Sequence, residues 1–342
     1  MSSQTAAAAV PPSAQLIQMG IAYWTSQLVF VAAQLGLADR LGTGPRTSDD
    51  LARDLGLDGA AFHRYLRTLA GLGVVTEVDR RVFALTPLGE ALRKDAPGSA
   101  RASILILGGP VGTRSWSELL YSLQTGKTGF ERFVGKNLFE YLAEHPAEAS
   151  LFSETMVGFH GAEPAAVAAA YDFSRFGTVV DVGGATGNML VNILKRHSRP
   201  RGVLYDLPHV VADAPAFLAS HDMAERVSIE SGSFFEGVPK GHDAYILSHI
   251  IHDWDEARCQ TILRNCRRAM KPDGRLLIVE MVLPEDDTPH PGKMLDMMML
   301  VGPGGQERTP SEYEQILRPA GFDLASVVPT QSAVSVVECV PR

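Results

Sequence analysis

The sequence predicts an α/β fold in which a mostly helical N-terminal domain precedes a doubly wound, mainly parallel sheet. Three observations predict it. Apolar strand patterns alternate with helical patterns after Phe176, which is typical of a parallel sheet covered by helices. Two helical patterns followed by two short strand patterns lie between Arg46 and Lys94. The last two strand patterns are close enough to form a hairpin, which would place an antiparallel final strand in the sheet.

Length and composition predict the domain organisation and the class of protein. A chain of 342 residues is about twice a typical domain, and we divide it into residues 1–100, a helical linker 101–170 that contributes to a substrate pocket, and the sheet domain 171–342. The net charge of −8 argues against a nucleic-acid partner. Three irregularly spaced cysteines favour a reduced, cytoplasmic protein, and no metal site is predicted.

The first 41 residues predict neither an export signal nor a membrane span. Residues 1–15 lack the basic residues and the long apolar segment of a signal peptide and are predicted to be a frayed tail. Leu16–Leu41 is apolar but is interrupted by polar residues, mostly glutamines. Such a helix requires burial on several sides, either by its own chain or by a second subunit.

The segment Arg46–Lys94 has the pattern of a winged helix-turn-helix, with one helix through His63 to Leu72 and two short strands in VVTEVDRRVFALT. DNA binding is the usual function of such a module. However, eight Lys/Arg are balanced by seven Asp/Glu, so the module is a poor phosphate binder. We therefore interpret it as a dimerisation or structural element. The helices that follow contain aromatic residues that are candidates for the interior: Trp116, Phe130, Phe133, Phe139 and Tyr141.

The strands of the sheet domain are predicted in order, and their ends carry the candidate site. They are TVVDVGG, GVLYDL, VSIESG, DAYILSHI and RLLIVEMVL, with FDLASVVPT and SAVSVVECV as the final pair. Helices are predicted up to about Lys195 and His221, and from Asp255 to Met270. The first strand runs into glycines that let the backbone approach a ligand, with Gly183 first among them. The dinucleotide fingerprint G-x-G-x-x-G is not matched, whereas D-x-G-x-A-x-G, Asp181 to Gly187, fits an S-adenosylmethionine motif.

The second and third strand ends add further candidates for ligand contacts. Asp206 can accept hydrogen bonds from ribose hydroxyls, although capping a helix at DLPHVV would also explain it. In SGSFF, Ser233 can hydrogen-bond an adenine edge and Phe234 can lie against its face, although an aromatic residue there also suits a core.

The fourth strand ends in SHIIHDWDEARC, where the pattern is most informative. His252 is placed between a buried strand and a helix capped by Asp253 or Asp255, so its imidazole can face a ligand crevice, whereas His249 suits a structural role. In the next strand Glu280 is an acid in an apolar run and needs a partner, for which His252 is one candidate. Downstream, four methionines suit either a core or an adaptable pocket: Met294, Met297, Met298 and Met299.

With DVGGATG, DLPHVV, GSFF, HDWDE, IVEMVLP and GGQERT in this order, the chain resembles the class I S-adenosylmethionine-dependent O-methyltransferases of the caffeic acid, hydroxyindole and antibiotic-tailoring type. The resemblance implies a Rossmann-like cofactor sheet, a homodimer with interlocked N-terminal domains, and S-adenosylhomocysteine as the spent cofactor. The acceptor would be a small aromatic, phenolic compound of specialised metabolism.

The resemblance also implies roles for single residues. Gly183, Asp206, Ser233, Phe234 and Ser248 match cofactor-contacting positions, and Trp254 matches an aromatic near the adenine. His252 matches the general base, and Glu280 and Glu307 match the acids that orient it. Ser233 and Ser248 depart from the commoner Asp and Lys or Arg, which puts direct contacts with the cofactor by these two side chains in doubt.

Three alternatives remain open at this point. The winged-helix pattern alone supports a DNA-binding regulator with a ligand-sensing methyltransferase-like domain. The cofactor could instead serve N-, C- or S-methylation, or an unusual decarboxylation or hydroxylation, with His252 only positioning the substrate. A nicotinamide-dependent dehydrogenase ranks last because its fingerprint is missing.

Overall fold

The computed structural model describes residues 10–342, apart from the side chain of residue 157. The chain divides into two compact units. One comprises the chain up to Thr113 together with His145–Gly158, and the other comprises Arg114–Glu144 and Phe159–Arg342. The linker predicted at residues 101–170 is therefore shared between the two units. The predicted boundaries at residues 100 and 170 stay predictions.

The first unit contains the winged-helix pattern. Its helices are α1 (Pro12–Gln34), α2 (Leu37–Leu41), α3 (Ser48–Leu55), α4 (Gly59–Gly71), α5 (Pro87–Glu90) and α6 (Arg101–Gly108). β1 (Arg46–Thr47), β3 (Val82–Leu85) and β2 (Val75–Asp79) form a small antiparallel sheet in this order. Thr47 and Asp58 cap α3 and α4 by accepting from backbone amides, which fixes where these helices begin. Helices α7 (Pro110–Ser117) and α11 (Pro146–His160) cross the boundary between the units.

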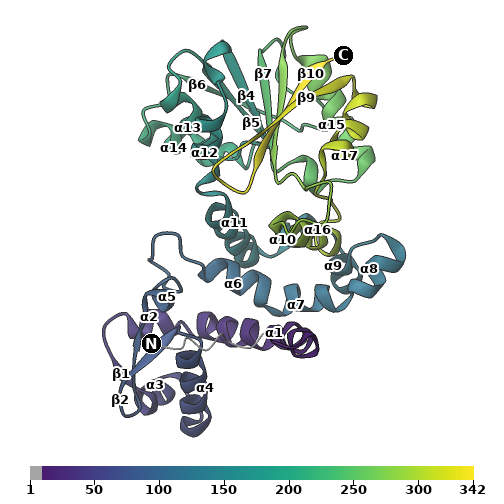
Figure 1. The fold of residues 1–342 in the computed structure, drawn as a ribbon. Coiled ribbons are helices and arrows are strands. Elements are labelled where there is room, and N and C mark those ends of the chain that lie inside the picture. The colour runs from purple at the N-terminus through teal and green to yellow at the C-terminus, as the bar shows by residue number, and fades with distance from the viewer. Residues whose placement is uncertain (1–9) are drawn as a thin grey trace, which may run out of the picture. The chain divides into compact units, whose positions relative to one another are not determined.

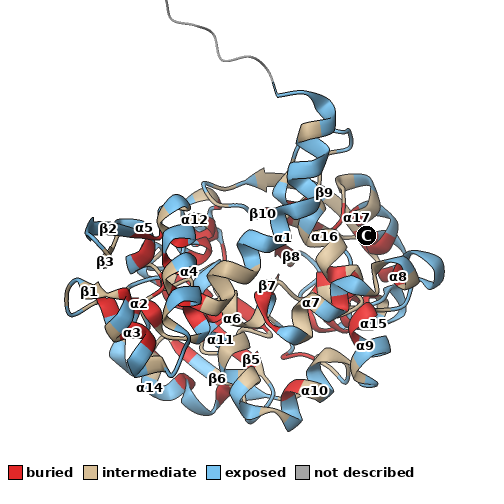
Figure 2. Ribbon diagram, turned by 90° about the horizontal axis from the view of Figure 1, so that it is seen from below, coloured by how far each residue is buried: buried red, intermediate tan, exposed pale blue. Residues whose placement is uncertain are grey.

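Helix α1 is the apolar helix of the sequence, and its own chain leaves most of it uncovered (Figure 2). Only Ala32 and Ala33 are buried, whereas the side chains of Leu16 and Met19 are 69% and 70% exposed. By length and composition α1 could cross a membrane, but one such helix near the N-terminus is weak evidence for a span. Of the predicted frayed tail, residues 1–9 lie outside the described residues. The prediction was wrong from Pro12 onward, because a proline is well tolerated in the first turn of a helix.

The second unit is built on a seven-stranded sheet (Figure 1). Its order is β6 (Val227–Ser231), β5 (Arg201–Asp206), β4 (Thr178–Val182), β7 (Ala244–Ser248), β8 (Arg275–Glu280), β10 (Ser335–Pro341) and β9 (Phe322–Pro329). Neighbouring strands from β6 to β8 pair in parallel, and β10 pairs antiparallel with both β8 and β9. The predicted α/β fold with an antiparallel final strand is confirmed, and the carboxyl ends of β4, β5, β7 and β8 meet at one edge.

Two apolar cores cover the two faces of this sheet. One face packs against α12 (Glu163–Ala170), α13 (Asn188–Arg196) and α14 (Ala214–Ser220), and the other against α15 (Glu256–Ala269) and α17 (Pro310–Leu317) (Figure 1). Strands β4, β7 and β8 are almost continuously buried, which is why their sequences are apolar without alternation. Asp255, one of the two predicted candidates, caps α15 by accepting from the Arg258 amide.

Shorter helices complete the second unit: α8 (Leu119–Thr125), α9 (Gly129–Val134), α10 (Leu138–Glu144) and α16 (Pro291–Val301). The prediction of interior aromatics in this region holds fully only for Phe130; Trp116, Phe133 and Phe139 are between 37% and 40% exposed. Helices of six to eight residues separated by glycines bury a side chain on one side at most, which explains the difference. Of the methionines on α16, Met299 is buried and Met294 is exposed.

Candidate active site

The turn after β4 brings the backbone close to its neighbours. Gly183 has φ of +75°, and a Cβ there would lie 2.5 Å from Ile250 Cδ1. A Cβ at Gly184 would lie 2.5 Å from the Asp181 carboxylate. Ala185 adopts φ of 50°, which is unusual for a residue with a side chain and marks local strain. Larger residues are thereby excluded from this turn, and the amides at the start of α13 remain available to a ligand.

Asp206 ends β5 and connects its strand end to the glycine turn. Its Oδ2 accepts from the Ala185 amide at 3.0 Å and its Oδ1 from the Leu207 amide at 2.7 Å. The alternative of a helix cap at DLPHVV is wrong, because turns and a short 3-10 helix (Val211–Asp213) follow instead. A carboxylate has about four acceptor positions, so both oxygens of Asp206 retain capacity for hydroxyl donors.

Asp181 lies beneath the same turn and is 1% exposed. Burial, reinforced by the nearby Asp206 carboxylate, raises the pKa of Asp181 to about 7. Its Oδ2 is buried and has no hydrogen-bond partner within residues 10–342. The sequence predicts Asp181 only as part of the motif, without an individual role.

An aromatic cluster lies beside the turn and comes from three separate segments. Phe234 Cε1 is 3.7 Å from the position of a Cβ on Gly183. The ring centroid of Trp254 lies 6.1 Å from that of Phe234, 4.9 Å from that of Phe235 and 5.6 Å from that of Phe139, which stacks on it. The sequence indicated Phe139 only as a candidate for the interior, and Phe235 was missed. No local pattern could have revealed the contact of Phe139 with Trp254, because the two residues are more than a hundred positions apart.

Ser233 and Ser248, which the sequence predicts as cofactor contacts, lie at or just after the ends of strands. The Ser233 hydroxyl accepts weakly from the Phe235 amide at 3.3 Å, which shapes the turn after β6. Ser248 is the last residue of β7 and is half-buried. The structure therefore gathers the predicted cofactor-contacting residues at one edge of the sheet, while their contacts with a cofactor stay predictions.

His252 lies in a short 3-10 helix (Ile251–Asp253) that follows β7. Its Nδ1 is 2.6 Å from Glu307 Oε1, and its side chain is 7% exposed. Its Nε2 is 3.6 Å from Asp253 Oδ1, and no atom within the described part of the chain hydrogen-bonds to it. The buried Glu307 carboxylate can only accept, so Nδ1 carries the proton in the neutral ring and Nε2 is the basic atom.

The backbone of His252 is held as firmly as its ring. Its amide donates to Glu280 Oε1 at 3.0 Å, and its carbonyl accepts from the Gln306 amide at 2.8 Å. Glu280 also accepts from the hydroxyl of Tyr313. The expectation that Glu280 orients the imidazole differs from this geometry, in which Glu307, of the two glutamates, is the one that hydrogen-bonds to the ring. Glu280 positions the backbone that carries it.

The carboxylates around His252 determine its charge. Burial lowers the pKa of the imidazole, but Asp253, the hydrogen bond to Glu307 and the charge of Glu280 more than offset this and raise it well above its usual 6.5. Burial also raises the pKa of Asp253, to about 6. At neutral pH the ring of the free protein is therefore protonated, with Glu307 as its partner.

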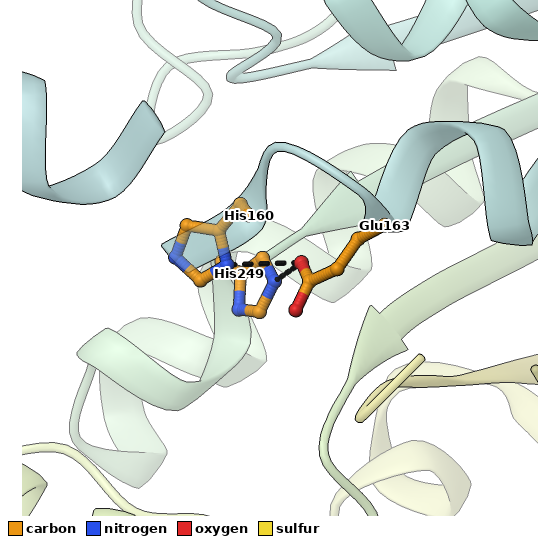
Figure 3. A group of neighbouring side chains, drawn as sticks. All are labelled: His160, Glu163 and His249. Atoms are coloured by element: carbon orange, nitrogen blue, oxygen red, sulfur yellow. Dashed lines mark hydrogen bonds and ion pairs between the residues drawn. The ribbon is translucent and has the colours of Figure 1, made fainter. Parts of the chain in front are cut away.

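A second cluster comprises His160, Glu163 and His249 (Figure 3) and lies next to His252. His249 Nε2 is 2.7 Å and His160 Nδ1 is 2.9 Å from the same Glu163 oxygen, Oε2. The ring centroids of His249 and His252 are 5.1 Å apart. Sequence reasoning assigned His249 to a structural role and missed His160 and Glu163, which lie in a helical region without a distinguishing motif.

Comparison with known proteins identifies the family of the chain. A family model described as an O-methyltransferase domain matches residues 116–323. The chain belongs to this O-methyltransferase family. A second family model, an O-methyltransferase dimerisation domain, matches residues 17–95 and covers the winged-helix pattern. The interpretation of that module as a dimerisation element is thus favoured over a DNA-binding regulator.

Relatives of this methyltransferase match over nearly its whole length. Phenazine O-methyltransferase PhzM of Lysobacter antibioticus is 43% identical over 100% of both chains. A crystal structure of NcsB1 from neocarzinostatin biosynthesis, with S-adenosylmethionine and a hydroxy-methyl naphthoic acid, has a TM-score of 0.81 at 31% identity and covers 93% of this chain and 96% of that one. The 8-amino-8-demethylriboflavin N,N-dimethyltransferase of Streptomyces davaonensis is 35% identical and covers 95% and 94%.

The methyltransferase uses S-adenosylmethionine, and its residues fit that molecule. The glycine turn excludes side chains, and Asp206 has free acceptor capacity beside it. Replacement of Asp206 by alanine is expected to weaken binding of S-adenosylhomocysteine about tenfold or more, because charge-assisted hydrogen bonds to the ribose would be lost. Calorimetric titration measures this affinity. An unchanged affinity would exclude Asp206 as a cofactor contact.

Proposed function

We propose that this enzyme transfers the methyl group of S-adenosylmethionine to a hydroxyl of a small aromatic, phenolic acceptor, with His252 as the general base. The observation that carries the proposal is the His252–Glu307 pair. A buried carboxylate fixes Nδ1 at 2.6 Å and leaves Nε2 without a hydrogen bond among the described residues. Relatives whose names include phenazine and naphthoate acceptors support the aromatic class.

The chemistry requires a group that removes a proton from the acceptor. S-adenosylmethionine supplies a methyl group on a sulfonium, which leaves as a neutral thioether when an oxygen attacks the methyl in line. A neutral phenol, with a pKa of about 10 taking tyrosine as the model, is a poor nucleophile. Because the carboxylates raise the pKa of His252 toward that of a phenol, the proton can be shared between the two at little cost in free energy. His252 thus holds the hydroxyl proton at Nε2 while the oxygen attacks.

The raised pKa of His252 predicts how the reaction depends on pH. The free enzyme must lose one proton before an acceptor hydroxyl can give its own to Nε2, so kcat/KM should rise with pH up to the pKa of His252. Glu307→Gln removes a carboxylate that stabilises the imidazolium. We therefore expect the acid limb of the profile to move to lower pH and the plateau rate to fall, because the ring is less well oriented. Initial rates across pH for both proteins measure this; an acid limb at the same pH in both would contradict the assignment.

We also propose the cofactor contacts that the sequence predicts. Gly183 and the amides after it would lie against the methionine part, and Asp206 would accept from the ribose hydroxyls. Phe234 and Trp254 would pack near the adenine within the aromatic cluster. Ser233 and Ser248 would act at the adenine edge and the methionine end, either directly or through water.

We propose that the enzyme is a cytoplasmic homodimer, and the exposed apolar surface of α1 supports the homodimer. The dimerisation model begins within α1, where the side chains of Leu16, Met19, Tyr23 and Trp24 are more than half exposed. Burial of such a surface against a second copy would be favourable by the hydrophobic effect. The full chain should sediment as a dimer, whereas Leu16→Asp combined with Trp24→Asp should yield mainly monomer. A monomeric wild-type protein at micromolar concentration would contradict this.

A further inference from the structure

The His160–Glu163–His249 cluster joins two elements beside the His252 base. His160 ends α11, Glu163 begins α12, and His249 follows β7 in the left-handed backbone region with φ of 53° (Figure 3). A histidine is held there at a cost in free energy that the surroundings must offset. This cost indicates that contacts of the side chain hold the ring in place. Glu163 hydrogen-bonds to the ring, and the centroid of the His160 ring lies 3.8 Å from its centroid.

The charges of the cluster determine which nitrogen of His249 carries the proton. Burial alone would raise the pKa of Glu163, but the two imidazole hydrogen bonds lower it to about 2, so the carboxylate is ionised and only accepts. Burial lowers the pKa of His249, so this ring is neutral at neutral pH. Its Nε2 therefore donates to Glu163, and its Nδ1 is a bare acceptor.

That acceptor is unsatisfied. Nδ1 of His249 is buried and has no hydrogen-bond partner within residues 10–342, and a buried acceptor without a donor is costly. The ring lies 5.1 Å from that of His252, between centroids. Two imidazoles thus lie side by side, each held by a glutamate through one nitrogen and each without a hydrogen bond at the other.

We propose that His249 is a specificity-determining residue whose Nδ1 accepts a hydrogen bond from a second donor group on the methyl acceptor, such as a hydroxyl or amine adjacent to the hydroxyl that is methylated. This inference rests on the proposed role of His252, because it places the acceptor next to that base. The substrate class is thereby narrowed to aromatic compounds with two neighbouring donor groups, of the catechol or aminophenol type. His249 selects the substrate, and His252 takes the proton.

The same three side chains have the composition of a metal site, but their geometry favours a hydrogen-bonded cluster. Ligands of tetrahedral zinc, with bonds of about 2.0–2.2 Å, are separated by roughly 3.3–3.6 Å. Here the two nitrogens lie only 2.7 and 2.9 Å from the Glu163 oxygen. A ligating histidine also normally donates its other ring N–H to a partner, and Nδ1 of His249 has none in the described part of the chain.

Three probe acceptors test the proposal with the full-length enzyme. Catechol has a neighbouring donor, guaiacol has a neighbouring methoxy oxygen that cannot donate, and phenol has neither. We expect the kcat/KM of the wild type for catechol to exceed that for guaiacol and phenol by about tenfold or more, since a buried acceptor left unpaired costs this much. Equal values for the three acceptors would overturn the inference while leaving the role of His252 intact.

Two variants assign the preference to Nδ1. His249→Leu removes the acceptor and should reduce the catechol preference to near unity. The preference is a ratio of two kcat/KM values measured on the same variant, so a loss of rate common to both acceptors cancels. His249→Asn tolerates the left-handed backbone and retains an acceptor near the position of Nδ1, so it should keep part of the preference. His221→Leu, at the C-terminal end of α14, is the matched control and should behave as the wild type. An unchanged catechol preference in His249→Leu would overturn the proposal.

Binding measurements separate this inference from the proposed reaction. Calorimetry of catechol and phenol with the S-adenosylhomocysteine complex should show tighter binding of catechol. Equal binding would overturn the proposed hydrogen bond to His249 even if no acceptor is methylated. Failure to methylate all three with catechol still bound more tightly would count against the proposed reaction alone. Stoichiometric binding of Zn²⁺ that is lost in Glu163→Gln would overturn the proposed hydrogen bond to His249 in favour of a metal site.

Discussion

Replacement of His252 by alanine is expected to lower kcat on a phenolic acceptor by about 10² to 10⁴-fold, the range that general-base catalysis contributes. The variant loses the atom that holds the hydroxyl proton, and the Glu307 carboxylate is left buried without its partner. Activity should not vanish, because positioning of the acceptor and the methyl group in line supplies a large separate part of the rate. Single-turnover kinetics with saturating cofactor measure the chemical step directly.

The affinity for S-adenosylhomocysteine is the control for this experiment. It should change by no more than about twofold, because the proposed partner of His252 is the acceptor rather than the cofactor. A neutral amine already presents its lone pair, so an N-methyltransferase of this family would tolerate the change far better than an enzyme that methylates hydroxyls. A variant that retains wild-type turnover on a phenol would remove His252 from the role of base and would favour that alternative.

Replacement of Gly305 by alanine is expected to reduce turnover by about 10²-fold, although this residue carries no functional group. A Cβ at this position would lie 1.7 Å from the carbonyl oxygen of His252 and 2.7 Å from its carbonyl carbon. The segment that carries Gln306 and Glu307 must therefore move away from His252. The hydrogen bonds of His252 with both residues would be lost or weakened.

The Gly237→Ala variant is the matched control for Gly305→Ala, because a Cβ at Gly237 meets no atom within 4 Å. Thermal unfolding reports any general loss of stability. Overpacking typically lowers the free energy of unfolding by about 1–3 kcal/mol. A double variant of Gly305 and His252 should be no slower than His252→Ala alone, since both changes act on the same pair. Multiplied losses in the double variant would show that Gly305 acts through something other than His252.

The strands of the sheet domain and the edge that carries the site could be predicted from local sequence. Runs such as TVVDVGG and RLLIVEMVL indicate buried strands, and parallel pairing then brings their carboxyl ends together. The resemblance supplied His252 and Glu307 as partners. The structure places them 2.6 Å apart although 55 positions separate them in the chain.

The contacts of single atoms could not be predicted in the same way. Glu280 was expected at the ring of His252, but its carboxylate accepts from the backbone amide of His252 and from the hydroxyl of Tyr313. These contacts depend on how η3 (Ile251–Asp253) and α17 pack. The contact of His249 with Glu163 joins residues 86 positions apart, and no periodicity links them. The exposed surface of α1 could not be predicted for another reason. An apolar pattern predicts that a helix is buried, but it does not say whether the same chain or a second subunit covers the helix.

A crystal structure of the enzyme with S-adenosylhomocysteine and catechol would show whether His252 can act as the base. We expect the reacting hydroxyl within hydrogen-bonding reach of His252 Nε2, about 2.6–3.2 Å, and on the line to the thioether sulfur. A hydroxyl that lies near the sulfur but out of reach of Nε2, with the imidazole still enclosed between Glu307 and Asp253, would contradict it.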